Sequence, residues 1–140
     1  MKHLIPFTLV IFALALAACT GQAGSEPATS GEIDVANLPA DVDVKTAAAV
    51  QDNPDVVLID VREQWEYDQG HIPGVTLIPM GEVSNRLSEI PKDKTVILSC
   101  RSGNRSGQVT DFLRNNGYDN VHNMTGGIVA WEKAGLEVEK

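Results

Sequence analysis

The chain has 140 residues, of which 43% are hydrophobic and 21% charged, so it has room for one globular domain of ordinary size. Its formal net charge of −8 argues against nucleic-acid binding, because neutralising phosphates requires a basic surface. Its two cysteines, Cys19 and Cys100, sit in an apolar leader and in a later domain, so no disulfide framework is expected.

Residues 1–18 have the pattern of a secretory signal peptide. Lys2 and His3 give a short polar start, and residues 4–18 are apolar apart from Thr8. A membrane-spanning helix needs about 20 apolar residues, whereas the core of a signal peptide is shorter. We therefore expect this segment to direct the chain out of the cytoplasm.

The end of this leader, Leu16-Ala17-Ala18-Cys19, resembles the lipobox of bacterial lipoproteins. The resemblance implies cleavage before Cys19 and acylation of that cysteine. The protein would then be extracytoplasmic and anchored by lipid to a bacterial membrane, in the periplasm or at the cell surface. Ordinary secretion is the alternative. Residues 19–40 are rich in Gly, Ser, Thr, Ala and Pro, and we expect them to form the anchor cysteine and a flexible tether.

Residues 41–140 form the expected folded domain, in which apolar strand patterns alternate with helical ones. Strands are expected at 56–59, 76–78, 95–99 and 120–124, helices at 44–51, 63–69, 81–89, 104–115 and 127–134, and a short strand or turn near residue 42. This alternation is typical of an α/β fold in which helices cover a parallel sheet. Ligands of such folds bind beyond the carboxyl ends of the strands.

Cys100 lies at that end of the predicted sheet, between the strand 95–99 and the helix 104–115. A helix N-terminus stabilises a thiolate, and nearby arginines lower the pKa of a thiol. Cys100 is also the one thiol expected in the mature soluble domain. The structural alternative is a small buried hydrophobe, but the polar neighbours Arg101 and Arg105 argue against it.

Several short motifs follow one another in a fixed order over residues 41–138. They are Asp60-Val61-Arg62-Glu63, Glu66-Tyr67, Gly70-His71-Ile72-Pro73-Gly74, the run from Cys100 to Arg105, and Thr125-Gly126-Gly127 before Trp131. This order resembles the rhodanese-like sulfurtransferase domain. The resemblance implies an α/β fold with a five-stranded parallel sheet flanked by helices on both faces.

The same resemblance implies that Cys100 is the catalytic nucleophile, which accepts a sulfane sulfur as a covalent persulfide and passes it on. The expected donor is a small anion such as thiosulfate, which the loop arginines attract, and the expected acceptor is a thiol or cyanide. No cofactor besides the persulfide, no metal and no nucleic acid is expected. The other residues of the six-residue loop would bind the substrate: Arg101, Ser102, Gly103, Asn104 and Arg105.

Other polar residues have structural interpretations. Asp60 and Arg62 could support the site, but an ion pair that holds the loops together is preferred. His71 is expected to fix a turn rather than to act as a base, and His122 is expected to be structural. These two histidines and one cysteine do not make a metal site. Trp131 is expected on the inner face of the last helix.

Two other classes of function stay open. Phosphatases and arsenate reductases of related fold carry a loop one residue longer, with the arginine six positions after the cysteine. Here Ser106 occupies that position and the arginine is Arg105, which favours a sulfur atom over a phosphate. The other class is a non-catalytic module that binds a partner or exchanges disulfides.

Overall fold

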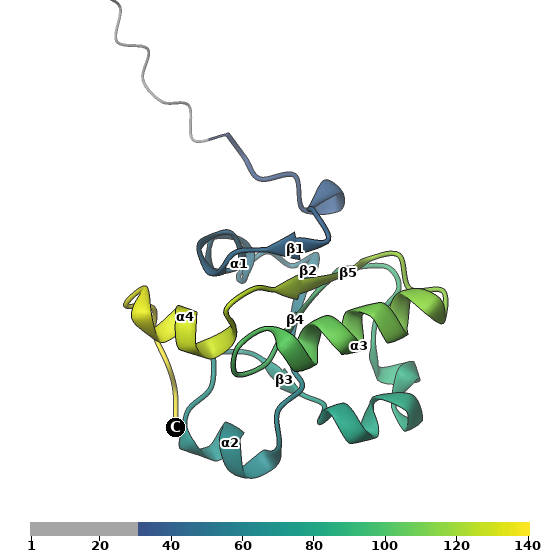
Figure 1. Ribbon diagram of the computed structural model, residues 1–140. Coiled ribbons are helices and arrows are strands. Elements are labelled where there is room, and N and C mark those ends of the chain that lie inside the picture. Colours follow the sequence, from purple (N-terminus) through teal and green to yellow (C-terminus); the bar gives the residue numbers. More distant parts are fainter. Residues whose placement is uncertain (1–30) are drawn as a thin grey trace, which may run out of the picture. The chain divides into compact units, whose positions relative to one another are not determined.

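The computed structural model describes residues 31–140 (Figure 1). The predictions for the signal peptide, for Cys19 and for the first part of the tether lie outside the described residues. The strands are β1 (Asp41–Val42), β2 (Val56–Asp60), β3 (Thr76–Leu77), β4 (Thr95–Ser99) and β5 (Val121–Met124). The α-helices are α1 (Val44–Val50), α2 (Gln64–Gln69), α3 (Asn104–Asn115) and α4 (Gly127–Lys133), and the 3-10 helices are η1 (Val35–Asn37), η2 (Met80–Asn85) and η3 (Leu87–Glu89).

All five strands join one sheet in the order β1-β5-β4-β2-β3, and every pairing in it is parallel. This confirms the predicted five-stranded parallel sheet. β4 occupies the centre, and all five of its residues are buried. A strand covered on both faces has to be apolar throughout, which explains the run Val96-Ile97-Leu98.

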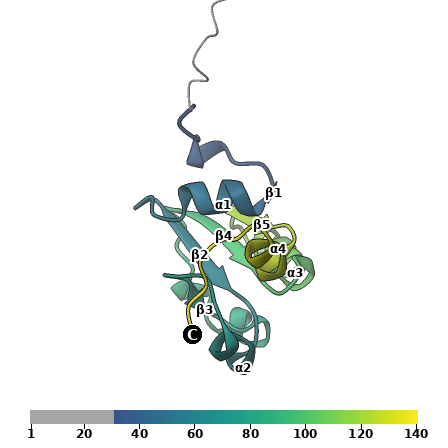
Figure 2. The same ribbon diagram turned by 90° about the vertical axis from the view of Figure 1, so that its left-hand side faces the viewer.

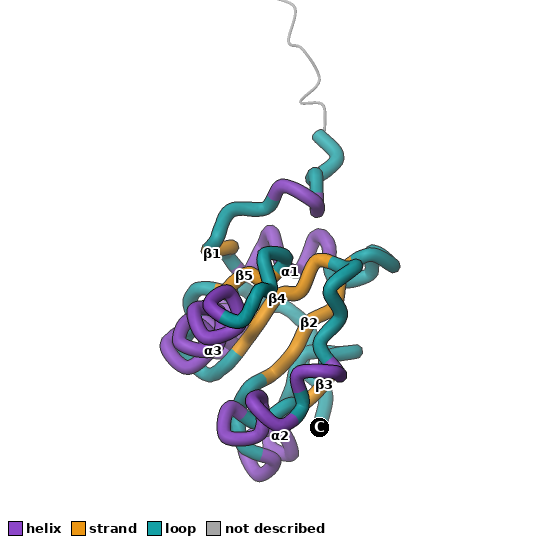
Figure 3. Tube along the Cα trace, turned by 90° about the vertical axis from the view of Figure 1, so that its right-hand side faces the viewer, coloured by secondary structure: helices purple, strands orange, loops and turns teal. Residues whose placement is uncertain are grey.

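Helices cover both faces of the sheet, as predicted. On one face α1 and α4 bury a core that includes Ala47, Ile97 and Trp131. On the other face α3, η2 and η3 bury Leu98 and Leu113. Figure 1 shows α3 next to β4 and β5, and Figure 2, a quarter turn away, shows α1 near the viewer. In Figure 3 the strands β5, β4 and β2 lie side by side, with α3 next to them.

The prediction of a single helix over 81–89 is wrong. The segment forms η2 and η3, because Arg86 between them leaves the helical region with φ −121° and ψ 22°. Gly81, Ser84 and Asn85 are weak helix formers, which favours the shorter turns. Hydrogen bonds from Arg86 to Glu82 and Glu89 connect the two turns.

Residues 35–40 were expected in the tether, but they contact the domain. The Thr95 hydroxyl donates a hydrogen bond of 2.6 Å to the Val35 carbonyl oxygen, and His122 Nδ1 lies 2.7 Å from the Pro39 carbonyl oxygen. Leu38 packs against the same core as α1. Within residues 31–140, no helix is both long and apolar enough to cross a bilayer.

Candidate active site

The cysteine loop leaves the carboxyl end of the central strand and enters α3. The Cys100 residue is only 1% exposed, yet its sulfur has polar partners. The backbone N–H of Gly103 donates to Sγ at 3.1 Å, and the Ser106 Oγ lies 3.3 Å from Sγ. The sulfur therefore sits in a cradle of hydrogen-bond donors, unlike a cysteine that only fills apolar space.

These contacts change the acidity of the thiol. Burial raises the pKa of Cys100, but hydrogen bonds from the Ser106 hydroxyl and from the backbone N–H groups of Ser106, Ser102 and Gly103 outweigh the burial. The pKa of Cys100 thus lies below its ordinary value. The loop favours the thiolate, which is the nucleophilic form of cysteine.

Two glycines let the loop curl this tightly. Gly103 has a φ of +93°, and a β-carbon there would lie 3.0 Å from the backbone nitrogen of Gly126. Gly127 has a φ of +56°, and a β-carbon there would collide with the backbone oxygen of Cys100. The next backbone N–H, that of Ile128, donates to the same Cys100 oxygen at 2.9 Å. The start of α4 therefore packs directly on the loop.

Arg105 does not point at the sulfur as an anion-binding group would. Its guanidinium forms a two-pronged ion pair with Glu66 of α2, with both N–O distances 2.7 Å. This pair holds the pKa of Glu66 at about 2, because Arg105 donates two hydrogen bonds to the charged carboxylate. Glu66 also accepts a hydrogen bond from the backbone N–H of Glu63. The interaction fixes α2 to the start of α3.

Asp60 and Arg62 form the expected ion pair, buried and with N–O distances down to 2.6 Å. The Arg62 guanidinium also donates to the backbone oxygens of Glu66 and Gly70. Removing either partner would leave a buried charge without compensation. The pair acts as a clamp between the end of β2 and α2, and it has no direct contact with Sγ among the hydrogen bonds of the described residues.

The remaining loop side chains face outward. Arg101, Ser102 and Asn104 are exposed, and Asn104 Oδ1 accepts a hydrogen bond from Gln108. Arg101 lines a cavity of about 290 Å³ between α2 and α4, together with the exposed Trp65. Of the charged loop residues, Arg101 is thus the one placed to meet a molecule from solution.

Three residues contribute to this arrangement without having been predicted as site residues. Glu66 pairs with Arg105, and Ser106 contacts the sulfur, as described above. The buried Asn123 of β5 accepts a hydrogen bond from the Ser106 hydroxyl at 2.7 Å. The position of Ser106 directly after the loop could have indicated a contact with the sulfur. Nothing in the sequence distinguishes Asn123 from other strand residues.

The side chains of His71 and His122 bind backbone oxygens, in keeping with the structural interpretation of both. His71 Nδ1 donates to the Tyr67 carbonyl oxygen at 3.1 Å, and the two rings stack with centroids 3.7 Å apart. The backbone of His71 forms an antiparallel bridge with Glu139. Among residues 31–140, no group of His, Cys, Asp and Glu is arranged to hold a metal ion.

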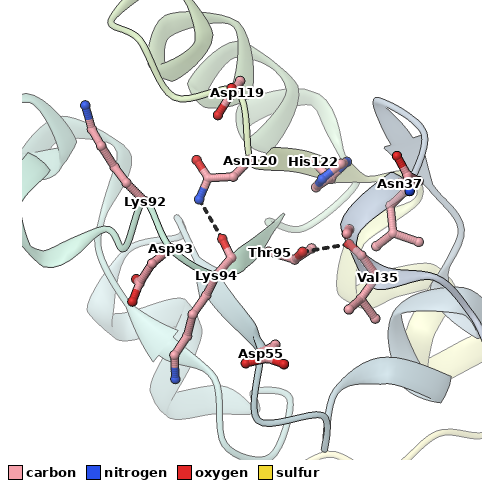
Figure 4. A pocket seen from close by; sticks show the side chains of 12 residues that line it. Val35, Asn37, Asp55, Lys92, Asp93, Lys94, Thr95, Asp119, Asn120 and His122 are labelled. Atoms are coloured by element: carbon pink, nitrogen blue, oxygen red, sulfur yellow. Dashed lines mark hydrogen bonds between the residues drawn. The ribbon is translucent and has the colours of Figure 1, made fainter.

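A second cavity, of about 660 Å³, lies at the amino ends of β2, β4 and β5 (Figure 4). Its polar side chains mainly bind the backbone. Asn120 Nδ2 donates to the Lys94 and Pro91 carbonyl oxygens, and Thr95 donates to Val35. The cavity is larger than the one beside the cysteine loop, but its lining contains neither a cysteine nor a serine.

A central parallel strand that delivers a cysteine into a loop closed by the next helix is the arrangement of a rhodanese-like domain. The family model described as "Rhodanese-like domain" matches residues 43–134, so the chain belongs to this family. The fold is similar to a rhodanese-related protein from Thermoplasma volcanium, with a TM-score of 0.66 and 27% identity. That match covers 72% of this chain and 98% of the other.

Sulfurtransferases occur among the similar proteins. The chain is 46% identical over 87 residues to a protein named "Sulfurtransferase" from Allochromatium vinosum, covering 62% of this chain and 81% of that one. It also resembles the thiosulfate sulfurtransferase of Pseudomonas aeruginosa, with a TM-score of 0.65 and 29% identity. That match covers 71% of this chain but only 20% of the other. The similarities support a sulfurtransferase in the general sense.

Proposed function

We propose that the protein is a sulfurtransferase that carries sulfane sulfur as a persulfide on Cys100. The observation that carries the proposal is the cradle around Sγ, in which backbone N–H groups and the Ser106 hydroxyl favour an anionic sulfur. An outer persulfide sulfur is also an anion, and the backbone N–H groups of the loop suit it in the same way. The burial of Cys100 favours slim reagents such as thiosulfate and cyanide.

The reaction takes two balanced steps. The Cys100 thiolate attacks the outer sulfur of thiosulfate, a bond forms between the two sulfurs, and the electron pair of the donor's S–S bond leaves with sulfite. Cyanide or a thiolate then attacks the outer persulfide sulfur, and the electron pair of that S–S bond returns to Cys100 as a thiolate. Arg101, an exposed residue of the loop, attracts the anionic donor. This division predicts ping-pong kinetics.

Intact-mass spectrometry tests the covalent step. The full chain carrying Cys19→Ser has Cys100 as its one thiol. After thiosulfate treatment we expect a gain of one sulfur, about 32 Da, which a reductant reverses. The fraction of chains that gain this sulfur is called sulfur loading below. Sulfite release should match sulfur loading in amount.

The control is the same chain carrying Cys100→Ser, which should gain no sulfur and release no sulfite. If the Cys19→Ser chain gains no mass but hydrolyses a phosphate ester, the phosphatase alternative replaces the proposal. If it does neither but exchanges disulfides with a thiol reagent, the redox-module alternative applies.

We also propose that the protein is lipid-anchored through Cys19 on the extracytoplasmic side of a bacterial membrane. The run Leu16-Ala17-Ala18-Cys19 after an apolar leader supports this cellular location. A labelled fatty acid fed to expressing cells should appear in the chain and be absent from the Cys19→Ser variant. Recovery of the native chain as an unlabelled, secreted protein would contradict the anchor.

A further inference from the structure

A chain of hydrogen bonds leads from the surface to the Cys100 sulfur. Asn123 Nδ2 donates to the Asp41 carboxylate at 2.9 Å, and the Ser106 Oγ lies 2.7 Å from Asn123 Oδ1 and 3.3 Å from Cys100 Sγ. Ser106 and Asn123 are buried, whereas Asp41 is exposed. The parallel pairing of β1 with β5 sets Asp41 directly beside Asn123.

The orientation of the Asn123 amide follows from the chemistry of its neighbour. A carboxylate only accepts hydrogen bonds, so the amide nitrogen of Asn123 has to face Asp41. The amide oxygen then faces Ser106 and needs a donor. The Ser106 hydroxyl is the donor within reach, and it has a single hydrogen.

That one hydrogen has two possible acceptors, Asn123 Oδ1 and Cys100 Sγ. When the sulfur is a thiol, its S–H can donate to Ser106 Oγ while the hydroxyl donates to Asn123, and all three groups are satisfied. When the sulfur is a thiolate, its charge attracts the hydroxyl hydrogen, and the buried Asn123 oxygen loses its donor. A buried acceptor without a partner costs free energy, so Asn123 competes with the thiolate.

We propose that Asn123, oriented by Asp41, is a positioning residue that competes with the Cys100 sulfur for the hydrogen of the Ser106 hydroxyl. The hydroxyl bonds to Asn123 in the thiol and in the persulfide, whose inner sulfur is neutral. It turns to Sγ when that atom becomes an anion, as it does when the outer sulfur leaves. The competition sets how readily Cys100 forms a thiolate, and it restrains the hydroxyl between turnovers.

Other charged groups surround the cysteine loop but do not join this chain. They are Arg101 and Arg105 of the loop, Glu66 of α2, and the Asp60–Arg62 pair at the end of β2. In the described part of the chain, none of their side chains is hydrogen-bonded to Ser106 or Asn123. A change at Asp41 can therefore reach the sulfur through hydrogen bonds only by way of Asn123 and Ser106.

Titration of the Cys100 thiolate tests this inference. The inference rests on the proposed function, because that function requires Cys100 to react as an anion. Ultraviolet absorbance is followed against pH in the full chain carrying Cys19→Ser, and the same chain with Cys100→Ser gives the baseline. Asp41→Asn keeps the shape but can donate as well as accept, so the Asn123 amide can turn and release Ser106. We expect the ratio of thiolate to thiol at a fixed pH to rise about three-fold or more, as for one redirected hydrogen bond.

Two controls separate this effect from the loss of a charge. Asp43→Asn removes a carboxylate two residues away while preserving a residue type suited to the N-cap of α1, and it should leave the ratio unchanged. In a Ser106→Ala background, Asp41→Asn should also have no effect, because the shared hydroxyl is absent. The titration needs no sulfur transfer, so its outcome is independent of the sulfur-loading result.

Three outcomes would overturn the inference. The ratio could be unchanged or lower in Asp41→Asn, it could rise equally in Asp43→Asn, or the rise could persist in the Ser106→Ala background. The last two would show a through-space effect of charge. Should the Ser106→Ala chain fail to fold, the comparison of Asp41→Asn with Asp43→Asn still decides between the two explanations.

Discussion

The two ends of the sheet carry cavities of opposite character. At the amino end, the cavity of about 660 Å³ is lined by side chains that hold backbone segments, among them Asn120 and Thr95 (Figure 4). At the carboxyl end, the cavity of about 290 Å³ adjoins a loop whose backbone N–H groups point at a sulfur. Donors directed at a side-chain nucleophile, rather than volume, distinguish the candidate active site.

The difference follows from how parallel strands are connected. At the carboxyl ends, helices begin, and their first N–H groups have no partner within the helix. Gly103 and Ile128 use such groups on the sulfur and on the backbone oxygen of Cys100. At the amino ends, turns precede the strands. The backbone N–H and carbonyl groups of these turns need hydrogen-bond partners of their own. Changes at the carboxyl end should therefore alter chemistry, and changes at the amino end should alter stability alone.

The largest effect is expected from Gly127→Ala, at the contact between α4 and the cysteine loop. The new β-carbon would collide with the Cys100 carbonyl oxygen at a φ of +56°. We expect the free energy of unfolding to fall by about 3 kcal/mol and sulfur loading to drop in the molecules that stay folded. Urea denaturation and intact-mass spectrometry measure the two effects.

The matched control is Gly117→Ala, before β5 on the amino side of the sheet. Gly117 has a φ of +84°, but a β-carbon there meets nothing within 4 Å. Gly117→Ala should lower the free energy of unfolding by only about 1 kcal/mol, because of backbone strain, and it should leave sulfur loading unchanged. Equal losses of sulfur loading in the two variants would remove the distinction between the ends.

A smaller effect is expected from Glu66→Gln. The pKa of Glu66 is about 2 in the folded chain against an ordinary 4.5, so the ion pair with Arg105 stabilises the fold above about pH 4.5. That stabilisation disappears as the pH falls through about 2. We expect Glu66→Gln to lower the free energy of unfolding by on the order of 2 kcal/mol at pH 7. This difference in stability from the unchanged chain should shrink between pH 5 and pH 2. Urea denaturation at several pH values measures it.

Glu89→Gln is the control for this ion pair. Glu89 accepts the same two-pronged arrangement from Arg86, at 2.8 and 2.7 Å, but on the exposed surface. Surface pairs contribute little, so its removal should have a much smaller effect. A cost for Glu66→Gln that does not depend on pH would show that shape rather than charge connects α2 to α3.

The smallest effect is expected from Thr95→Val at the amino end. The variant keeps the volume but removes the donor to the Val35 carbonyl oxygen, which should cost about 1 kcal/mol. Sulfur loading should equal that of the unchanged chain. A clear loss of sulfur loading would show that the amino end influences the chemistry after all.

The strands and the position of Cys100 at the end of the central strand were predictable because both depend on short runs of sequence. The buried run at 95–99 followed by a cysteine indicates a strand that ends in a loop, and the structure has both. The region 81–89 was harder, because its apolar spacing suits a helix while Gly81 and Asn85 weaken one. In the structure, the first of the two short turns, η2, packs against α3.

The partners within the site were not predictable, because they are far apart in the sequence. Glu66 and Arg105 are 39 positions apart, and Ser106 and Asn123 are 17 apart. Their contacts depend on the order of strands in the sheet, which puts both β5 and β2 beside β4. A single sequence indicates that strands exist, but the order in which they pair is a property of the whole fold.

The central position of β4 also determines which parts of the site can move. Native-state hydrogen exchange should be slowest in β4, because it is paired on both sides and fully buried, and its amides open only when the domain unfolds. Faster exchange should begin at Arg101, where the chain leaves the strand. Cys100 lies at this boundary, so its backbone is fixed to the most protected element of the sheet while its side chain faces the loop.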